Sequence, residues 1–188
     1  MGFYIGSGLP FVDVNQSDWF YDNVLFGYSG GLFSGTSATT FTPSGTMTRG
    51  MMVTVLWRMS GSPQAAGAGF SDLPEDAWYA AAVNWAYENG VVSGVGNNLF
   101  APNDEITREQ MAVMLYNYAK FIGAELPKNR EGVFADEDKI SAWAKEAVSA
   151  MYAAEILNGK GLNDFDPQGK ATRAEVATMF TRFIEAMA

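Results

Sequence analysis

The strongest constraint on the fold of this chain is an internal repeat. The segment Phe11-Val-Asp13 returns as Phe70-Ser-Asp72 and again as Phe134-Ala-Asp136. Each copy continues with the same residue types in the same order: a Trp, a Gly, a Phe, a Pro and a Thr-Arg pair. The second copy is displaced from the first by 59 positions without a gap, and the third from the second by 64 positions at its start and 65 from the Trp onward. The fold is therefore expected to contain three versions of one unit.

The repeat divides the chain into three units joined by linkers. We expect a leader at residues 1–10, repeat 1 at 11–61, a linker at 62–69, repeat 2 at 70–122, a second linker at 123–133 and repeat 3 at 134–185. The segments between the copies have the composition of linkers.

Each repeat is predicted to be a helix, a turn-rich loop and a second helix. In repeat 2 an Ala-rich segment from Trp78 predicts a helix that runs to Asn89 and stops at Gly90. Residues 91–102 then supply Gly and Asn, which tolerate the positive φ of tight turns. A second helix is expected to begin at Thr107, where apolar residues start to recur at helical spacing.

The second helix of every repeat carries one apolar stripe. The stripes are Met52, Val55, Leu56 and Met59; Met111, Met114, Leu115, Tyr118 and Ile122; and Val176, Met179, Phe180, Phe183 and Ile184. A helix pair with one such stripe cannot bury it alone, so the three repeats should share a core. No segment alternates as a strand does. The expected fold is all-α, with three helix-loop-helix repeats packed as a pseudo-threefold trimer within one chain and, at most, a very short extended pair in the loops.

Composition excludes several classes of function. The chain has neither Cys nor His, so it lacks a Ser-His-Asp triad, a thiol nucleophile and an ordinary zinc site. Its formal net charge is −9, and the region from Met1 to Thr107 holds only the basic residues Arg49 and Arg58, which argues against nucleic acid. No run is long enough for membrane insertion, and no acidic cluster has the spacing of a calcium loop. No carboxylate pair stands out for catalysis. We expect no enzyme activity, no cofactor and no metal.

The repeated pattern resembles the S-layer homology (SLH) domain in its usual arrangement of three repeats. The resemblance rests on Phe-x-Asp, a Trp, a Gly before a turn, Phe-x-Pro and Thr-Arg, and it covers residues 11 to 185. It implies grooves between neighbouring repeats and anchoring to a pyruvylated secondary cell-wall polysaccharide of a bacterium, with peptidoglycan as a further partner. It also implies a monomeric pseudo-trimer at the cell surface. The start of the chain lacks the features of a signal peptide, so an extracellular protein would need a segment that this chain does not contain. The alternative function is a protein-protein interaction or assembly module of a surface protein.

The Thr-Arg motif is the first candidate for ligand binding. Thr107 and Thr172 fit a capping box, which explains the Thr and the Glu or Gln three residues later but not the Arg. An Arg beside helix-start amides could grip a carboxylate, and the resemblance implicates the motif arginine in ligand contact. The alternative is a structural salt bridge from each Arg to the Asp of its own repeat. Replacing Arg108 and Arg173 by Ala is expected to lower polymer binding with little loss of folding.

The first copy departs from the motif, because Gly50 and Met51 stand where the family usually has Ala and Glu. Its capping box is therefore incomplete, and we rank the sites on Arg108 and Arg173 above that on Arg49.

Glycines and tryptophans complete the candidate site. The glycines can serve the backbone conformation or let a sugar approach it. The tryptophans can stack on a sugar, although aromatic residues at the start of a packed helix, together with Tyr28 and Tyr87, are expected to be core residues. The candidate ligand-binding residues are Arg108, Arg173, Arg49, Thr107, Thr172, Thr48, Gly94, Gly159, Gly35, Trp78, Trp143 and Trp19.

Overall fold

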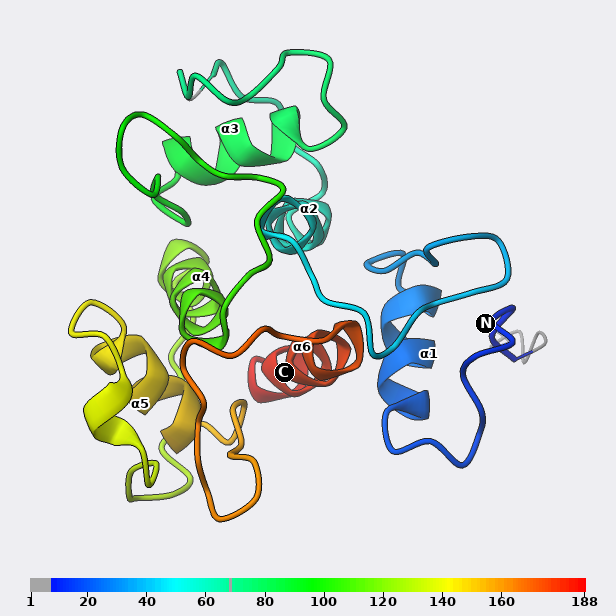
Figure 1. Ribbon diagram of the computed structural model, residues 1–188, viewed down its shortest axis with the longest axis vertical. Helices are drawn as coiled ribbons and strands as arrows, with labels where there is room; N and C mark the ends of the chain where they lie inside the picture. The colour runs from blue at the N-terminus through cyan, green and yellow to red at the C-terminus, as the bar shows by residue number, and fades with distance from the viewer. Residues whose placement is uncertain (1–7, 68) are drawn as a thin grey trace.

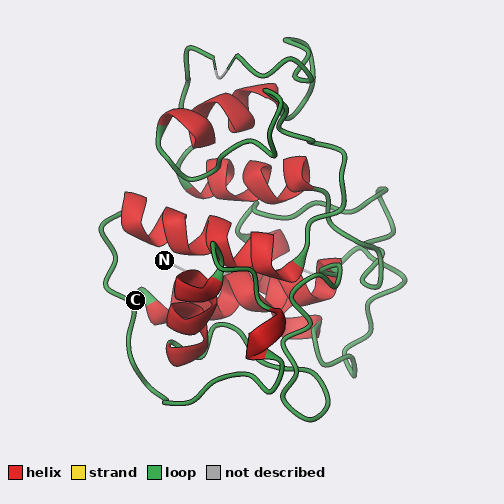
Figure 2. Cartoon of the chain, turned by 60° about the vertical axis from the view of Figure 1, so that its left-hand side comes forward, coloured by secondary structure: helices red, strands yellow, loops and turns green. Residues whose placement is uncertain are grey.

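The structure, a computed structural model, describes residues 8–67 and 69–188, so residues 1–7 of the expected leader lie outside it. Within the described residues it consists of helices and loops without a named strand (Figure 2). The elements are α1 (Tyr21–Ser29), α2 (Arg49–Met59), α3 (Ala80–Glu88), α4 (Arg108–Phe121), the 3₁₀ helix η1 (Glu137–Lys139), α5 (Lys145–Ala153) and α6 (Arg173–Ala186). The all-α expectation is confirmed for this part of the chain. None of its helices has the length and apolar character needed to cross a membrane.

The second helix of each repeat begins at the predicted threonine. Thr107 and Thr172 form complete capping boxes with Gln110 and Glu175. Thr48 accepts a hydrogen bond from the Met51 N–H, but Met51 has no group to return it, as its sequence predicts. The first helix of repeat 2 begins later than expected. α3 starts at Ala80, which leaves Trp78 outside the helix.

The helices pack between repeats rather than within them. α3 packs on α2, α5 on α4, and α1 on α6, so each short first helix lies against the second helix of another repeat (Figure 1). In Figure 1 the helices that open with the Thr-Arg motif, α2, α4 and α6, lie toward the middle of the view and the short helices lie outside them. The contacts follow a cyclic order, from repeat 1 to 2, 2 to 3 and 3 to 1.

Backbone hydrogen bonds follow the same cyclic order. The N–H of Ile106 donates to the Met47 carbonyl at 2.8 Å, that of Ala171 to Ile106 at 3.2 Å, and that of Met47 to Ala171 at 3.1 Å. Isolated bridges join the same segments: Thr48 with Glu105, Thr107 with Lys170, and Thr46 with Thr172. Two further bridges, Gly96 with Leu99 and Lys160 with Asp164, lie inside loops, where a very short extended pair was expected; the bridges between repeats were not predicted.

The three apolar stripes form one core. All the predicted stripe residues are buried or half-buried except Ile122, which is 44% exposed near the end of α4. The loop phenylalanines Phe41, Phe100 and Phe165 are completely buried in the same core.

An Asp carboxylate fixes each loop beside its buried Phe. Both oxygens of Asp136 accept backbone N–H groups, from Phe165 at 2.6 Å and Asp166 at 2.8 Å. The same pairs of bonds join Asp13 to Phe41 and Thr42, and Asp72 to Phe100 and Ala101. The residue after each Phe has a positive φ although it is not Gly, and the Asp clamp holds it in this sparsely populated conformation.

Candidate functional site: two grooves between the repeats

Each motif arginine is buried in the loop of the next repeat. Arg108 is 4% exposed, and its Nε and Nη2 donate to the carbonyls of Phe165 and Asn158 at 2.7 and 3.0 Å. The equivalent bonds join Arg49 to Phe100 (2.9 Å) and Ser93 (3.2 Å), and Arg173 to Phe41 (2.7 Å) and Ser34 (2.6 Å). Each guanidinium also lies over the ring of the Phe whose carbonyl it binds, at 4.5 to 5.2 Å.

This environment lowers the pKa of all three guanidinium groups, because burial removes water from the charged form. Nearby carboxylates oppose the shift: Asp72 and Asp104 for Arg49, and Glu175, Asp166 and Asp136 for Arg108. The motif arginines thus link neighbouring repeats, and nearby carboxylates partly offset the cost of burying their charge.

The amides at the helix starts are also bonded within the protein. At the start of α4, the N–H of Arg108 donates to Gly169 at 2.9 Å and that of Glu109 to Pro167 at 3.0 Å. Equivalent bonds close the starts of α2 and α6, and the Thr side chains cap the next amide. The backbone N–H groups that were candidates for ligand binding are therefore already hydrogen-bonded, either to the neighbouring repeat or to the capping Thr.

The third guanidinium nitrogen, Nη1, differs between the copies. In Arg108 it lies 3.3 Å from the Glu175 carboxylate, and in Arg173 it lies 3.8 Å from the Met47 sulfur. Nη1 of Arg49 has no hydrogen bond within the described residues, and because none of their buried side-chain nitrogens is unbonded, it reaches the surface. The expected ion pair between each Arg and the Asp of its own repeat does not occur in this part of the chain.

A groove of about 600 Å³ opens beside Arg49, and we name it the Arg49 groove. Its wall comes from repeat 1 through Arg49, from repeat 2 through the loop at residues 91–95 and α4, and from repeat 3 through Trp143. The α4 residues that line it are Gln110, Val113, Met114 and Asn117.

The Arg108 groove is its counterpart one repeat further on, with a volume of about 180 Å³. It combines Arg108 of repeat 2, the loop at residues 157–160 and α6 of repeat 3, and Trp19 of repeat 1. The α6 residues that line it are Glu175, Thr178, Met179 and Arg182. Each groove thus draws on all three repeats.

The tryptophans are exposed, so the expectation that they are core residues is wrong. Trp19 is 66% exposed, and Trp78 and Trp143 are each 59% exposed. Tyr28 and Tyr87 are also 40% and 45% exposed and pack edge-on against Phe11 and Phe70. Trp19 and Trp143 line grooves because they precede α1 and α5 and are not on a packed helix face.

The glycines are required by close approach of the backbone. A Cβ on Gly94 would lie 2.7 Å from the Leu99 carbonyl, and one on Gly159 would lie 2.8 Å from the Asn163 Cα. Gly35 is similarly enclosed by its loop. Gly94 and Gly159 also line the two grooves, so the conformational role and a ligand-facing position occur together.

Sequence reasoning missed the groove residues on the long helices and the loops, notably Asn117, Arg182 and Lys160. The alignment of the repeats could have identified two of them, because Asn117 and Arg182 occupy the same position nine residues after the motif Arg of their helix.

No group of acidic residues among those described could hold a metal ion.

These features define an all-α tandem-repeat module whose grooves are assembled between repeats. A family model for the S-layer homology domain matches residues 10–51, 69–112 and 133–177. The chain belongs to the S-layer homology domain family.

Relatives include enzymes and S-layer proteins. The chain is 32% identical over 179 residues to an endoglucanase of Bacillus sp. (strain KSM-635), covering 95% of this chain and 19% of that protein. It is 33% identical over 172 residues to the exoglucanase XynX of Acetivibrio thermocellus (90% and 16%), and 32% identical over 136 residues to the S-layer protein sap of Bacillus anthracis (72% and 16%). The chain spans less than a fifth of the length of each. The family and its S-layer members support a role in anchoring at the cell surface or cell wall.

Proposed function

We propose that this chain is a noncatalytic module that anchors a larger surface protein by binding an anionic, pyruvylated secondary cell-wall polysaccharide in its grooves. One observation carries the proposal. In two equivalent grooves an exposed Trp, a Gly-containing loop and a motif Arg come from three different repeats and face one space.

The groove chemistry suits a sugar. An indole ring offers an apolar face for the C–H face of a pyranose, and Gln110 and Asn117 line the larger groove with polar side chains. The Arg49 groove, at about 600 Å³, has the size of a small-molecule site. The smaller Arg108 groove suits a single sugar unit.

The motif arginines support binding in two ways. They hold the loops that line the grooves, and they add positive charge to the walls of an acidic protein. Arg49 also has Nη1 at the surface. Arg173 and Trp78, with Gly35 and Thr48, occupy the equivalent positions at the junction between repeats 3 and 1, and we assign them the same roles there.

We also propose that the functional unit is a monomeric pseudo-trimer. The cyclic order of the helix contacts and of the backbone bonds between repeats supports this arrangement.

Sedimentation with peptidoglycan sacculi tests the function. The protein is mixed with sacculi that retain their secondary polymer, sacculi stripped of it, and sacculi whose polymer lacks pyruvate. Binding to the first alone is the expected result. Equal binding to all three would identify peptidoglycan itself as the partner. Binding to none, with concentration-dependent self-association, would favour the assembly module instead.

Variants in the grooves test the site. Trp19→Ala and Trp143→Ala should each weaken polymer binding by roughly 3- to 10-fold, the effect of losing one aromatic stacking contact. Because both side chains are mostly exposed, the folding transition should change little. Phe26→Ala is the matched control, since Phe26 is 43% exposed on α1 and lines neither groove. Unchanged binding by both Trp variants would contradict the groove assignment.

A further inference from the structure

Equivalent positions in the two grooves carry different charges. Asn117, nine residues after Arg108 on α4, lines the Arg49 groove. Arg182, nine residues after Arg173 on α6, takes the same position in the Arg108 groove. At the loop position after the groove glycine, Val95 in one groove corresponds to Lys160 in the other. Among the described residues, Arg49 is the only charged one that lines the Arg49 groove, whereas Arg108, Lys160 and Arg182 line the other against one carboxylate, Glu175.

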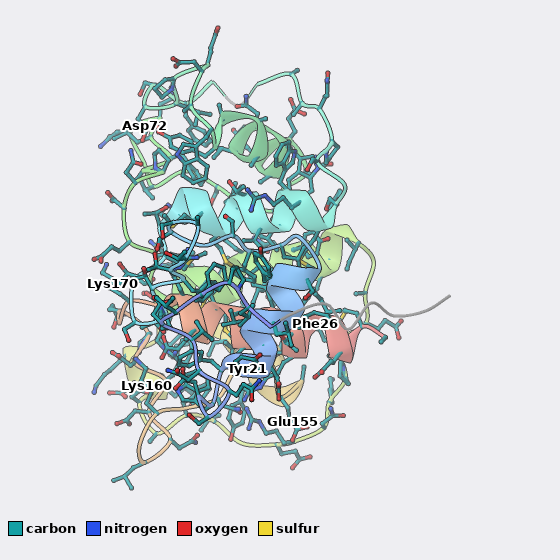
Figure 3. The ribbon with its side chains drawn as sticks, turned by 90° about the vertical axis from the view of Figure 1, so that its right-hand side faces the viewer. Tyr21, Phe26, Asp72, Glu155, Lys160 and Lys170 are labelled. Carbon is teal, nitrogen blue, oxygen red and sulfur yellow. The ribbon has the colours of Figure 1, made fainter. Side chains whose placement is uncertain are left out.

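Most charges in the Arg108 groove are already paired. Glu175 lies 3.3 Å from Arg108 and 3.7 Å from the Lys160 Nζ, which also pairs with Asp166 at 3.2 Å. Lys160 is at the surface, on the left side of Figure 3. Arg182 makes no hydrogen bond and no ion pair within the described residues.

The second linker supplies another arginine close to the loop that Arg182 would be expected to bind. At the other two junctions the residue equivalent to Arg182 binds a loop carbonyl: Arg58 donates to Leu32 at 3.2 Å, and Asn117 donates to Val91 at 3.3 Å. In repeat 3 the equivalent carbonyl is that of Ile156, and Arg130 of the linker binds the carbonyls of Tyr152, in α5, and of Leu157, in the loop. Its Nε donates to Tyr152 at 2.7 Å, its Nη2 donates to Leu157, and its guanidinium lies 3.7 Å from the Tyr152 ring centre.

Arg130 thus binds on both sides of Ile156, while Arg182 lines the groove and makes no hydrogen bond with this loop within the described residues. Since no buried side-chain nitrogen in the described residues lacks a hydrogen bond, the guanidinium nitrogens of Arg182 reach the surface. Burial and the nearby charge of Arg130 both lower the pKa of Arg182, while Glu185 opposes them. The Arg108 groove thus holds Arg108, Lys160 and Arg182 against Glu175, in a chain of net charge −9.

We infer that the two grooves recognise different parts of one glycan: the Arg108 groove takes a sugar that bears a carboxylate, through Arg182, and the Arg49 groove takes an uncharged sugar beside Asn117. This inference rests on the proposed function. A planar guanidinium binds a carboxylate through two parallel hydrogen bonds, which an amide side chain cannot match. Besides its bond to Val91, Asn117 has a second amide N–H and the Oδ1 acceptor, a neutral pair that suits a hydroxyl or an acetamido group.

Reciprocal substitutions test the division between the grooves. Arg182→Asn gives the Arg108 groove the side chain of its counterpart, and Asn117→Arg does the reverse. The double variant keeps the net charge and so controls for non-specific electrostatics. Both positions are half-buried on helix surfaces, and thermal unfolding checks that each variant is folded. Binding is measured with polymer released from the wall in pyruvylated and depyruvylated forms.

Arg182→Asn should weaken binding to the pyruvylated polymer by roughly 10- to 100-fold, the effect of a charge-assisted hydrogen bond, and should leave binding to the depyruvylated form unchanged. Arg182→Lys should recover part of the loss. Asn117→Arg should strengthen binding to the pyruvylated form. If the wild type binds the polymer but Arg182→Asn binds both forms as the wild type does, the inference is wrong. If the wild type binds neither form, the proposed function fails and the inference fails with it.

Discussion

The Arg49 groove and the Arg108 groove share one backbone plan and differ in a few side chains. In both, a buried arginine crosses into the next repeat, binds two loop carbonyls and lies over a phenylalanine. The differences lie at the groove-lining positions, where Gln110 faces one groove and Glu175 the other. The comparison teaches that the contacts between repeats fix the shape of each groove, while the lining residues are free to set what it binds.

The largest effect should come from removing a motif arginine. Arg108→Ala is expected to lower the free energy of unfolding by about 3–5 kcal/mol, because it leaves two carbonyls and Glu175 without their buried partner. This reverses the expectation from sequence that folding would change little. Arg49→Ala should cost about 1 kcal/mol less, since its Nη1 has no carboxylate partner. Urea unfolding measures both. Equal losses would show that the Glu175 ion pair adds nothing.

A methyl group on the groove glycine should have the next largest effect. Gly94→Ala and Gly159→Ala should each lower the free energy of unfolding by about 1–3 kcal/mol, because the new Cβ would overlap backbone atoms of the same loop. Ser93→Ala is the control, since Arg49 uses only the carbonyl of Ser93. Thermal unfolding is the measurement. An unchanged unfolding temperature for either variant would mean that the loop backbone shifts to accommodate the methyl group.

Exchanging the carboxylate and amide between grooves should have a smaller effect on stability. Glu175→Gln keeps a capping-box residue but removes the ion pairs to Arg108 and Lys160, at a cost of about 1 kcal/mol or less. It should strengthen binding to the pyruvylated polymer, because the groove loses its negative charge. Gln110→Glu should leave that binding nearly unchanged, because the groove that Gln110 lines takes the uncharged sugar. Sedimentation and urea unfolding measure the two effects, and changes of the opposite sign would contradict the charge comparison.

The smallest effect on the free energy of unfolding is expected at acidic pH, from the Asp carboxylates that fix the loops. Although burial favours the neutral form, hydrogen bonds from two backbone amides hold the pKa of Asp13 and of Asp136 below the ordinary value of 3.8. Their stabilising effect is complete above that value and is lost as the pH falls through the lower pKa of the folded state. Unfolding measured at several values of pH below about 4 should show this loss. Asp136→Asn should reduce the slope, and an unchanged slope would assign the acid sensitivity to other groups.

Local features of the fold followed from the sequence. The capping boxes at Thr107 and Thr172 and the apolar stripes depend on residues within a few positions of one another, where helical spacing determines which side chains meet. The incomplete cap at Thr48 was predicted for the same reason.

The partners of the motif arginines could not be predicted in this way. Arg173 binds the loop at Phe41, 132 residues earlier, and helical periodicity carries no information about contacts at that separation. Trp19 was misassigned because it was placed on a packed helix that in fact begins after it. The positive φ of Ala101 was hidden because the carboxylate that stabilises it lies 29 residues away.

The triangle of backbone bonds among Met47, Ile106 and Ala171 governs how the chain can fold during synthesis. Repeat 1 leaves the ribosome first, yet its bond to Ala171 must wait until repeat 3 has been made. The protein therefore cannot complete its fold one repeat at a time.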